Sequence, residues 1–169
     1  MTEKEQTHIF ETWLHQCKAL IFKIVRAYAF TSDDQSDLFQ EISIQVWRSI
    51  PTFRHEAAIT TWIYRISLNT AISWVRKERK RNQAETLENV QHILQESKIE
   101  VDERLVWLYK EIQQLDEIDR SITLLLLDGL SYKEMAGILG ITESNVGVRI
   151  NRVKKQLIAK SKKYDHYGV

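Results

Sequence analysis

The apolar residues near the start of the chain recur at steps of three and four over residues 10–28. This spacing places them on one face of a single long helix. A second helix is expected to begin at Ser32, which forms a capping box with Gln35 three positions later. Its pattern continues to Ser49, and Pro51 ends it because proline cannot continue a helix. This part of the chain therefore predicts two amphipathic helices in succession.

The same helical period runs through residues 59–81 and returns over residues 105–129. The segment between them, residues 82–104, is polar and only weakly periodic, which indicates a partly helical linker. Gly129 follows the last periodic residue and is a natural C-terminal stop. Helical segments on both sides of a linker indicate two domains.

Glycine and proline are scarce in this chain. No glycine precedes Gly129, and Pro51 is the only proline. The chain therefore lacks the turn residues that a β-rich domain needs. The sequence predicts an all-α protein with two small helical domains, residues 1–81 and 105–169, joined by the partly helical linker at residues 82–104.

Residues 130–157 have the helix caps and turn residues of a helix-turn-helix. Such a motif would make the second domain a DNA-binding domain. Ser131 and Glu134 form a capping box at the start of the first helix. Gly140 ends that helix, and Thr142 caps the second helix, which enters the major groove in such motifs. A plain helical hairpin with a solvated charged face is the alternative. The residues expected to contact DNA are Thr142, Ser144, Asn145, Val148, Arg149, Asn151, Arg152 and Lys155.

Charged residues are nearly balanced in number but segregated along the chain. The sequence holds 24 basic and 23 acidic residues, for a net charge of +1. Residues 76–81 hold five bases and one acid, and residues 149–163 hold seven bases and no acid. Residues 82–119, between them, hold ten acids against three bases. The small net charge therefore conceals two basic patches that can face phosphates.

The helix expected at residues 59–81 carries a polar stripe opposite its apolar side. The stripe includes Asn69, whose amide offers both a donor and an acceptor to a base edge. A solvated helix face is the ordinary alternative for such a stripe. Its members recur at steps of three or four and are Arg65, Asn69, Ser73, Arg76 and Lys80.

The chemistry-bearing side chains argue against an enzyme or a cofactor. Cys17 is the only cysteine and lies in an apolar stripe, so we expect it to be buried and to form neither a disulfide nor a metal site. The five histidines are scattered, and no cluster has metal-binding, catalytic or phosphate-loop spacing. The N-terminus lacks a signal-peptide pattern, and no apolar run is long enough to cross a bilayer. We expect a cytoplasmic protein that is not an enzyme.

Three segments of the chain carry a family resemblance. They are DLFQEISIQVW, TTWIYRISLNTAISWVRKERKR and LLLLDGLSYKEMAGILGITESNVGVRINRVKKQL. In this order and spacing they resemble bacterial sigma factors of the extracytoplasmic-function (ECF) group, over residues 8–163. The resemblance implies a promoter-melting domain that reads the minus-ten element, a linker, and a domain that reads the minus-thirty-five element. It also implies core RNA polymerase, promoter DNA and an anti-sigma factor as partners.

The resemblance further implies which residues act. The loop with Phe53 and Arg54 matches a segment that captures a flipped base, although Phe53 fits equally well as a core plug between helices. The acidic linker matches a segment that threads toward the RNA exit path of the polymerase. The residues matching the helix that docks on core polymerase are Asp34, Asp37, Leu38, Gln40, Glu41 and Trp47. Those matching the minus-ten contacts are Phe53, Arg54, Arg65, Asn69, Ser73, Arg76, Lys77 and Lys80.

Gly147 departs from the family pattern, which often has a polar or basic residue at this position. Glycine weakens a helix by about 1 kcal/mol relative to alanine, and a close approach of the backbone to DNA would explain its presence. The sequence thus predicts a sigma factor that directs core polymerase to promoters and opens them. A stand-alone helix-turn-helix regulator and a helical interaction protein are the alternatives.

Overall fold

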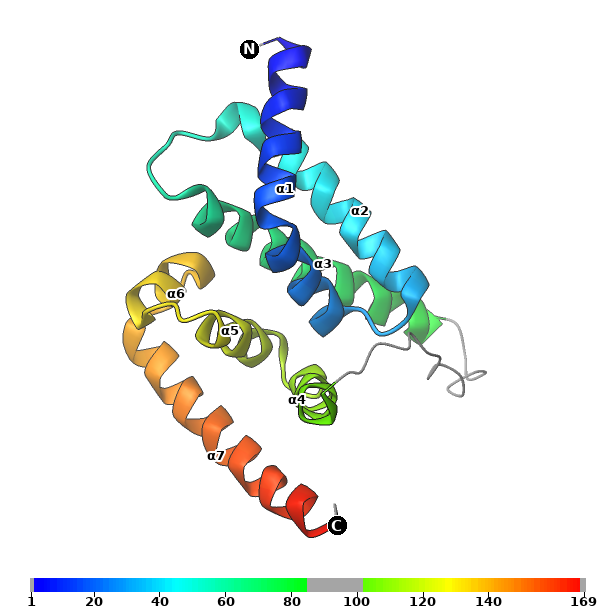
Figure 1. Cartoon of the computed structure of the whole chain (residues 1–169), viewed down its shortest axis with the longest axis vertical. Coiled ribbons are helices and arrows are strands. Elements are labelled where there is room, and N and C mark those ends of the chain that lie inside the picture. The colour runs from blue at the N-terminus through cyan, green and yellow to red at the C-terminus, as the bar shows by residue number, and fades with distance from the viewer. Residues whose placement is uncertain (1, 85–101, 168–169) are drawn as a thin grey trace. The chain divides into compact units, whose positions relative to one another are not determined.

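The computed structural model describes residues 2–84 and 102–167. Within these ranges every regular element is helical, as the sequence predicts (Figure 1). Most of the predicted linker, residues 85–101, lies outside the described residues. The elements are α1 (Glu3–Tyr28), α2 (Ser32–Ser49), the short 3-10 helix η1 (Ile50–Thr52), α3 (Ile59–Ala84), α4 (Glu103–Gln113), α5 (Glu117–Leu127), α6 (Tyr132–Leu139) and α7 (Glu143–Tyr167).

The chain divides into two compact units, Met1–Val106 and Trp107–Val169, which we call unit 1 and unit 2. In unit 1, the helices α1, α2 and α3 pack against one another in pairs. Cys17 is only 2% exposed, as predicted, and its burial raises the pKa of the thiol. The fully buried large side chains of this unit are Ile21, Ile24, Tyr28, Leu38, Ile42, Ile63 and Leu68.

The starts of α1 and α2 differ from the sequence prediction. Helix α1 begins at Glu3 rather than near residue 10, because Thr2 and Glu5 form a capping box that supports a polar first turn. The predicted cap at Ser32 is wrong. The hydroxyl of Thr31 accepts the Asp34 amide at 3.0 Å, so Ser32 becomes the first residue of α2.

In unit 2, α5, α6 and α7 pack around Ile122, Leu125, Met135 and Ile150. The predicted caps of the helix-turn-helix are present. The Ser131 hydroxyl accepts the Glu134 amide at 3.3 Å, and the Glu134 carboxylate accepts the Ser131 amide at 2.7 Å. Gly140 ends α6 in the left-handed region at φ 68°, and the Thr142 hydroxyl accepts the Asn145 amide at 3.1 Å.

The turn between α4 and α5 is fastened by a buried arginine, Arg120, which is 3% exposed. Its guanidinium donates to the carbonyl oxygens of Gln113 at 2.6 Å and Leu115 at 2.9 Å. These bonds satisfy carbonyl groups that the end of α4 would otherwise leave without partners. No helix within the described ranges is long and apolar enough to span a membrane.

Candidate nucleic-acid interface

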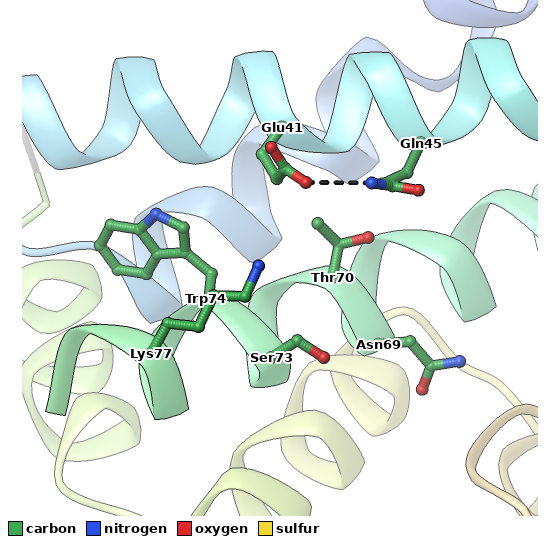
Figure 2. Close-up of a pocket in the computed structure, with 7 residues that line it drawn as sticks. All are labelled: Glu41, Gln45, Asn69, Thr70, Ser73, Trp74 and Lys77. Carbon is green, nitrogen blue, oxygen red and sulfur yellow. Dashed lines mark hydrogen bonds between the residues drawn. The ribbon is translucent and has the colours of Figure 1, made fainter. Parts of the chain in front are cut away.

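A groove of about 440 Å³ lies between α2 and α3 in unit 1 (Figure 2). It brings one residue predicted to bind polymerase, Glu41, beside residues predicted to hold the minus-ten strand. The Glu41 carboxylate accepts a hydrogen bond from the Gln45 amide at 3.0 Å. Figure 2 shows Trp74 on the side of α3 that faces α2 and Asn69 pointing away from α2. The lining residues are Glu41, Gln45, Asn69, Thr70, Ser73, Trp74 and Lys77.

Three of these lining residues, Gln45, Thr70 and Trp74, were not predicted from the sequence as site residues. Trp74 is half-buried and directly follows Ser73, a member of the polar stripe. An aromatic side chain beside a polar and basic stripe is the pattern on which nucleic-acid bases stack. That pattern is visible in the sequence, but the groove itself depends on how α2 packs against α3.

The polar stripe of α3 is exposed to solvent. Its opposite side is buried, with Ile63 and Leu68 at 0% and 1% exposure. The stripe thus lies on the outer face of unit 1, where it can meet a partner. Lys80 lies within α3, but its side chain is outside the described part of the chain. The exposed predicted residues are Arg65, Asn69, Ser73, Arg76 and Lys77.

The loop after η1 places Phe53 in an aromatic cluster. Its ring centroid lies 5.1 Å from that of Trp13 in an edge-on arrangement, and 4.6 Å from that of Trp62. The His55 ring lies 4.6 Å from Phe53, and His55 itself has a left-handed backbone with φ 58°. Phe53 is half-buried whereas Arg54 is exposed. The packing favours the role of Phe53 as a plug between helices.

A second cavity, of about 400 Å³, opens beside this cluster. It is bounded by the loop and by the first turns of α1, which contribute Gln6 and Ile9. The sequence did not indicate this cavity, because its two walls are separated by about forty residues and meet only in the folded unit. The remaining lining residues are Trp13, Ile50, Pro51, Phe53 and His55.

The predicted polymerase-docking residues divide by exposure along α2. Asp37 and Gln40 are exposed, and Asp34 and Glu41 are half-buried. Leu38, which the resemblance also places among the docking residues, is fully buried at 0% exposure. It packs in the core of unit 1 and supports the acidic face from beneath.

Trp47, the last predicted docking residue, is half-buried near the end of α2. Its ring packs edge-on against Phe10 at a centroid distance of 5.5 Å. The backbone carbonyl oxygen of Trp47 accepts a hydrogen bond from the side-chain amide of Gln6 at 2.8 Å. Trp47 therefore joins α2 to α1, and only part of its surface is available to a partner.

The second helix of the helix-turn-helix, α7, presents most of its predicted contacts to solvent. Val148 is 66% exposed. Arg149 is the exception, with a side chain that is 26% exposed. The exposed predicted residues are Thr142, Ser144, Asn145, Val148, Asn151, Arg152 and Lys155.

Gly147, the departure from the family pattern, faces the ring of Tyr132 at the start of α6. A Cβ atom at position 147 would lie 3.4 Å from Cε2 of Tyr132. This is an ordinary van der Waals distance, so the ring of Tyr132 would pack against a side chain at position 147 and does not itself require glycine there.

Several basic side chains of α7, those of Arg149, Arg152 and Lys160, form ion pairs within unit 2. Arg149 Nη1 lies 2.7 Å from Asp119 Oδ1, and Arg152 Nη2 bonds to Asp119 Oδ2. This bond to Asp119 raises the pKa of Arg152. Lys160 pairs with Glu111. The acids at 111 and 119, expected to belong to an acidic middle segment, therefore fold against α7 and reduce its net positive charge.

The architecture that these sites define is that of a sigma-70-type transcription initiation factor. Residues 13–81 match sigma-70 region 2, and residues 105–157 match sigma-70 region 4. The ECF RNA polymerase sigma-E factor of Escherichia coli (strain K12) is 30% identical over 156 residues, covering 85% of this chain and 79% of that protein. The protein of the same description from Haemophilus influenzae is 31% identical over 139 residues, covering 74% and 73%.

The chain belongs to the ECF family of RNA polymerase sigma factors and has their promoter-directing function. Sigma factors are transcription initiation factors without an enzymatic activity of their own. Two solved structures share the fold. The sigma factor RpoE of Bartonella quintana, in complex with the anti-sigma factor NepR, has a TM-score of 0.73 at 20% identity, covering 90% of this chain and 96% of that one. CnrH, in complex with the cytosolic domain of CnrY, has a TM-score of 0.67 at 19% identity, covering 93% and 90%.

Proposed function

We propose that this sigma factor binds core polymerase and recognises its promoter through three separate surfaces. The acidic face of α2 binds core polymerase, α3 holds the separated minus-ten strand, and α7 reads the minus-thirty-five duplex. The groove between α2 and α3 carries the proposal, because it places Glu41 beside Asn69 and Lys77 in one unit. A strand held there would lie next to the docked polymerase.

The acidic face of α2 supports the first assignment. Asp34 lies in the first turn of α2, where acids also favour the positive end of the helix, so its charge has a local reason. Asp37 and Glu41 lie beyond that turn and one turn apart, with Asp37 exposed and Glu41 half-buried. We therefore assign polymerase docking mainly to these two carboxylates, which would complement a basic partner surface.

The groove and the stripe on α3 support the second assignment. A separated strand needs basic side chains for its phosphates and flat surfaces for its unstacked bases. Arg65, Arg76 and Lys77 provide the charge, Asn69 can read a base edge, and Trp74 offers a ring in the groove. Holding bases apart in this way is what stabilises an opened promoter.

The exposed face of α7 supports the third assignment. A helix in the major groove reads base edges with side chains that project from its exposed side. Asn145, Asn151 and Arg152 are such side chains, and Val148 can contact the methyl group of a thymine. Lys155 can contact a phosphate and so fix the position of the helix on the duplex.

We infer the same division for the whole chain: residues 1–81 for core binding and the minus-ten element, 82–104 as linker, and 105–169 for the minus-thirty-five element. The protein would act in the cytoplasm, as a factor and not as an enzyme. The two neighbours of similar fold are each bound to a partner, NepR named as an anti-sigma factor and CnrY through its cytosolic domain. We propose an anti-sigma factor as a partner here also.

Run-off transcription with purified chain and core polymerase tests this proposal. We expect promoter-specific transcripts only when both components are present, with permanganate-reactive thymines around the minus-ten element. A stand-alone regulator would instead bind the promoter duplex tightly without polymerase and open no strand. That outcome would contradict the assignment of α3.

A further inference from the structure

The buried carboxylate of Asp119 joins α7, the second helix of the helix-turn-helix, to α5. Asp119 lies in the first turn of α5, and its side chain is only 6% exposed. An ionised carboxylate is costly to bury unless opposite charges and hydrogen bonds compensate it. Both compensating charges come from α7, because Arg149 binds Oδ1 and Arg152 binds Oδ2.

The network reaches a third residue on the preceding turn of α7. Arg149 Nε donates to Asn145 Oδ1 at 2.9 Å, while Arg149 Nη1 donates to Asp119 at 2.7 Å. Arg149 therefore bridges the buried carboxylate and the exposed amide. Since the Asn145 oxygen is engaged, its amino group is left as the donor that the side chain can offer to DNA.

Asp116, at the cap of α5, adds a second and weaker charge. It lies 3.6 Å from both Arg149 and Arg152, and its side chain is 52% exposed. Its Oδ1 accepts the Asp119 amide at 2.8 Å, so it is also fixed in place. Two acids at the start of α5, Asp116 and Asp119, thus face two arginines of α7.

We propose that Asp119 is a positioning residue for recognition of the minus-thirty-five element. It fixes Arg149 and Arg152, and through Arg149 also Asn145, in the orientations that meet the duplex. Arginine is rotamer-rich, and fixing it before binding removes an ordering cost from complex formation. This inference rests on the proposed function of α7 and adds to it a residue that does not itself touch DNA.

Asp119 could instead inhibit DNA binding, and removing its charge would then change the affinity for DNA in the opposite direction. A carboxylate that merely occupies the arginines would compete with DNA phosphates for them. Removing its charge would then strengthen binding to every sequence, because phosphate contacts carry no sequence information. Positioning predicts that binding weakens for the preferred sequence alone.

The test uses the holoenzyme assembled from the chain and core polymerase. The wild-type holoenzyme first selects its preferred fragment from a promoter library with a randomised minus-thirty-five segment. Affinity for that fragment and for one with this segment scrambled is then measured for Asp119→Asn, Asp119→Glu, Arg149→Ala and Glu143→Gln. Glu143 is exposed on the first turn of α7 and gives a matched control that changes the net charge equally. All measurements are made below the melting midpoint of the least stable variant.

We expect Asp119→Asn to lose about five- to tenfold in affinity for the selected fragment, the size of one weakened base contact. Its affinity for the scrambled fragment should be unchanged or higher. Asp119→Glu keeps the carboxylate and should recover part of the preference, whereas Glu143→Gln should keep all of it. In a chain that already carries Arg149→Ala and Arg152→Ala, Asp119→Asn should have no further effect on the preference.

Two results would overturn the proposal. Higher affinity of Asp119→Asn for both fragments would make Asp119 a competitor of DNA. Full preference in Asp119→Asn, together with a loss in Arg149→Ala, would show that Arg149 acts without being positioned. If Arg149→Ala and the double arginine variant both keep full preference, the assignment of α7 itself fails, and that outcome is distinct from the other two.

Discussion

The basic residues of α3 in unit 1 and those of α7 in unit 2 are held in different ways. Along α3, Arg65, Arg76 and Lys77 are exposed on the outer face of the helix, beside a groove that contains an aromatic ring. On α7, Arg149 and Arg152 are bound to a carboxylate of α5. The first surface is adaptable and the second is ordered in advance.

The difference suits the two forms of DNA that we assign to these helices. A separated strand has no fixed geometry, so long exposed side chains and a stacking ring can follow it. A duplex presents base edges at fixed positions, so side chains already in place lose less entropy on binding. The net charge of a sequence segment does not distinguish the two helices, because it counts ion-paired and exposed basic side chains alike.

The largest effect that we expect is a loss of stability when the core of unit 1 is changed, compared with a change on the acidic face of α2. Leu38→Ala should lower the free energy of unfolding of unit 1 by about 2–5 kcal/mol, because it leaves a cavity beneath α2. The neighbouring Asp37→Ala should change it by no more than about 0.5 kcal/mol. Amide hydrogen exchange, resolved by segment, measures both and should leave α5–α7 unaffected. Equal effects of the two substitutions would contradict the packing of Leu38 in the core of unit 1.

The second prediction concerns the acidic face itself. Reversing Asp37 and Glu41 together to lysine should weaken assembly with core polymerase by about 2–3 kcal/mol, since like charges would then face each other. Binding of labelled protein to core enzyme measures the change. A matched double reversal at Glu3 and Glu5, which are exposed in the first turn of α1, should leave assembly nearly unchanged. Docking lies elsewhere if both double variants assemble like the wild type.

A crossed pair of substitutions tests the contrast between the two DNA-facing helices. Trp74→Ala should weaken binding to a minus-ten single strand by about 1–3 kcal/mol, the contribution of one stacked base, and leave duplex recognition intact. Arg152→Ala should do the reverse, with a loss of about 1–2 kcal/mol on the minus-thirty-five duplex. Holoenzyme binding to a forked template and to a duplex fragment measures both. Effects that do not separate in this way would contradict the division of roles.

Local sequence signals were enough for much of the fold. The caps at Ser131, Gly140 and Thr142 depend on residues no more than four apart, and all three are where the sequence predicts them. The start of α2 was misassigned because Thr31 and Ser32 can both cap, and only the backbone conformation selects between them. Leu38 was assigned to the docking residues by family resemblance, and its spacing of four from Ile42 places it in the buried stripe of α2.

Contacts between distant parts of the chain could not be predicted in the same way. The pairing of Asp119 with Arg149 joins residues thirty positions apart, and it depends on how α5 crosses α7. The groove between α2 and α3 likewise requires the packed unit. The sequence did place an acid-rich segment before a base-rich one, but that segregation alone fits separate surfaces as well as an ion-paired network.

The smallest effect that we expect concerns the stability contributed by two capping boxes of the same chemistry. They are Thr2–Glu5 in unit 1 and Ser131–Glu134 in unit 2. In both, hydrogen bonds from the cap residue lower the pKa of the glutamate. Because the pKa of each glutamate is lowered on folding, each box stabilises the folded protein in full at pH values above 4.5, the pKa of the unfolded state. The box loses this contribution as the pH falls through the lower pKa of the folded state.

The two boxes should nevertheless differ in their effect on unfolding. Ser131→Ala should cost about 1 kcal/mol, because Met135 in the next turn is fully buried and couples this helix end to the core of unit 2. Thr2→Ala should cost less than about 0.5 kcal/mol, because the first turn of α1 is exposed and an end of this kind opens locally before the unit unfolds. Thermal unfolding of both variants at neutral pH measures the difference. Repeating it below pH 4.5, where the wild type has itself begun to lose the box, should shrink the penalty of Ser131→Ala. A penalty that does not change with pH would mean that the hydroxyl, and not the Glu134 carboxylate, carries the cap.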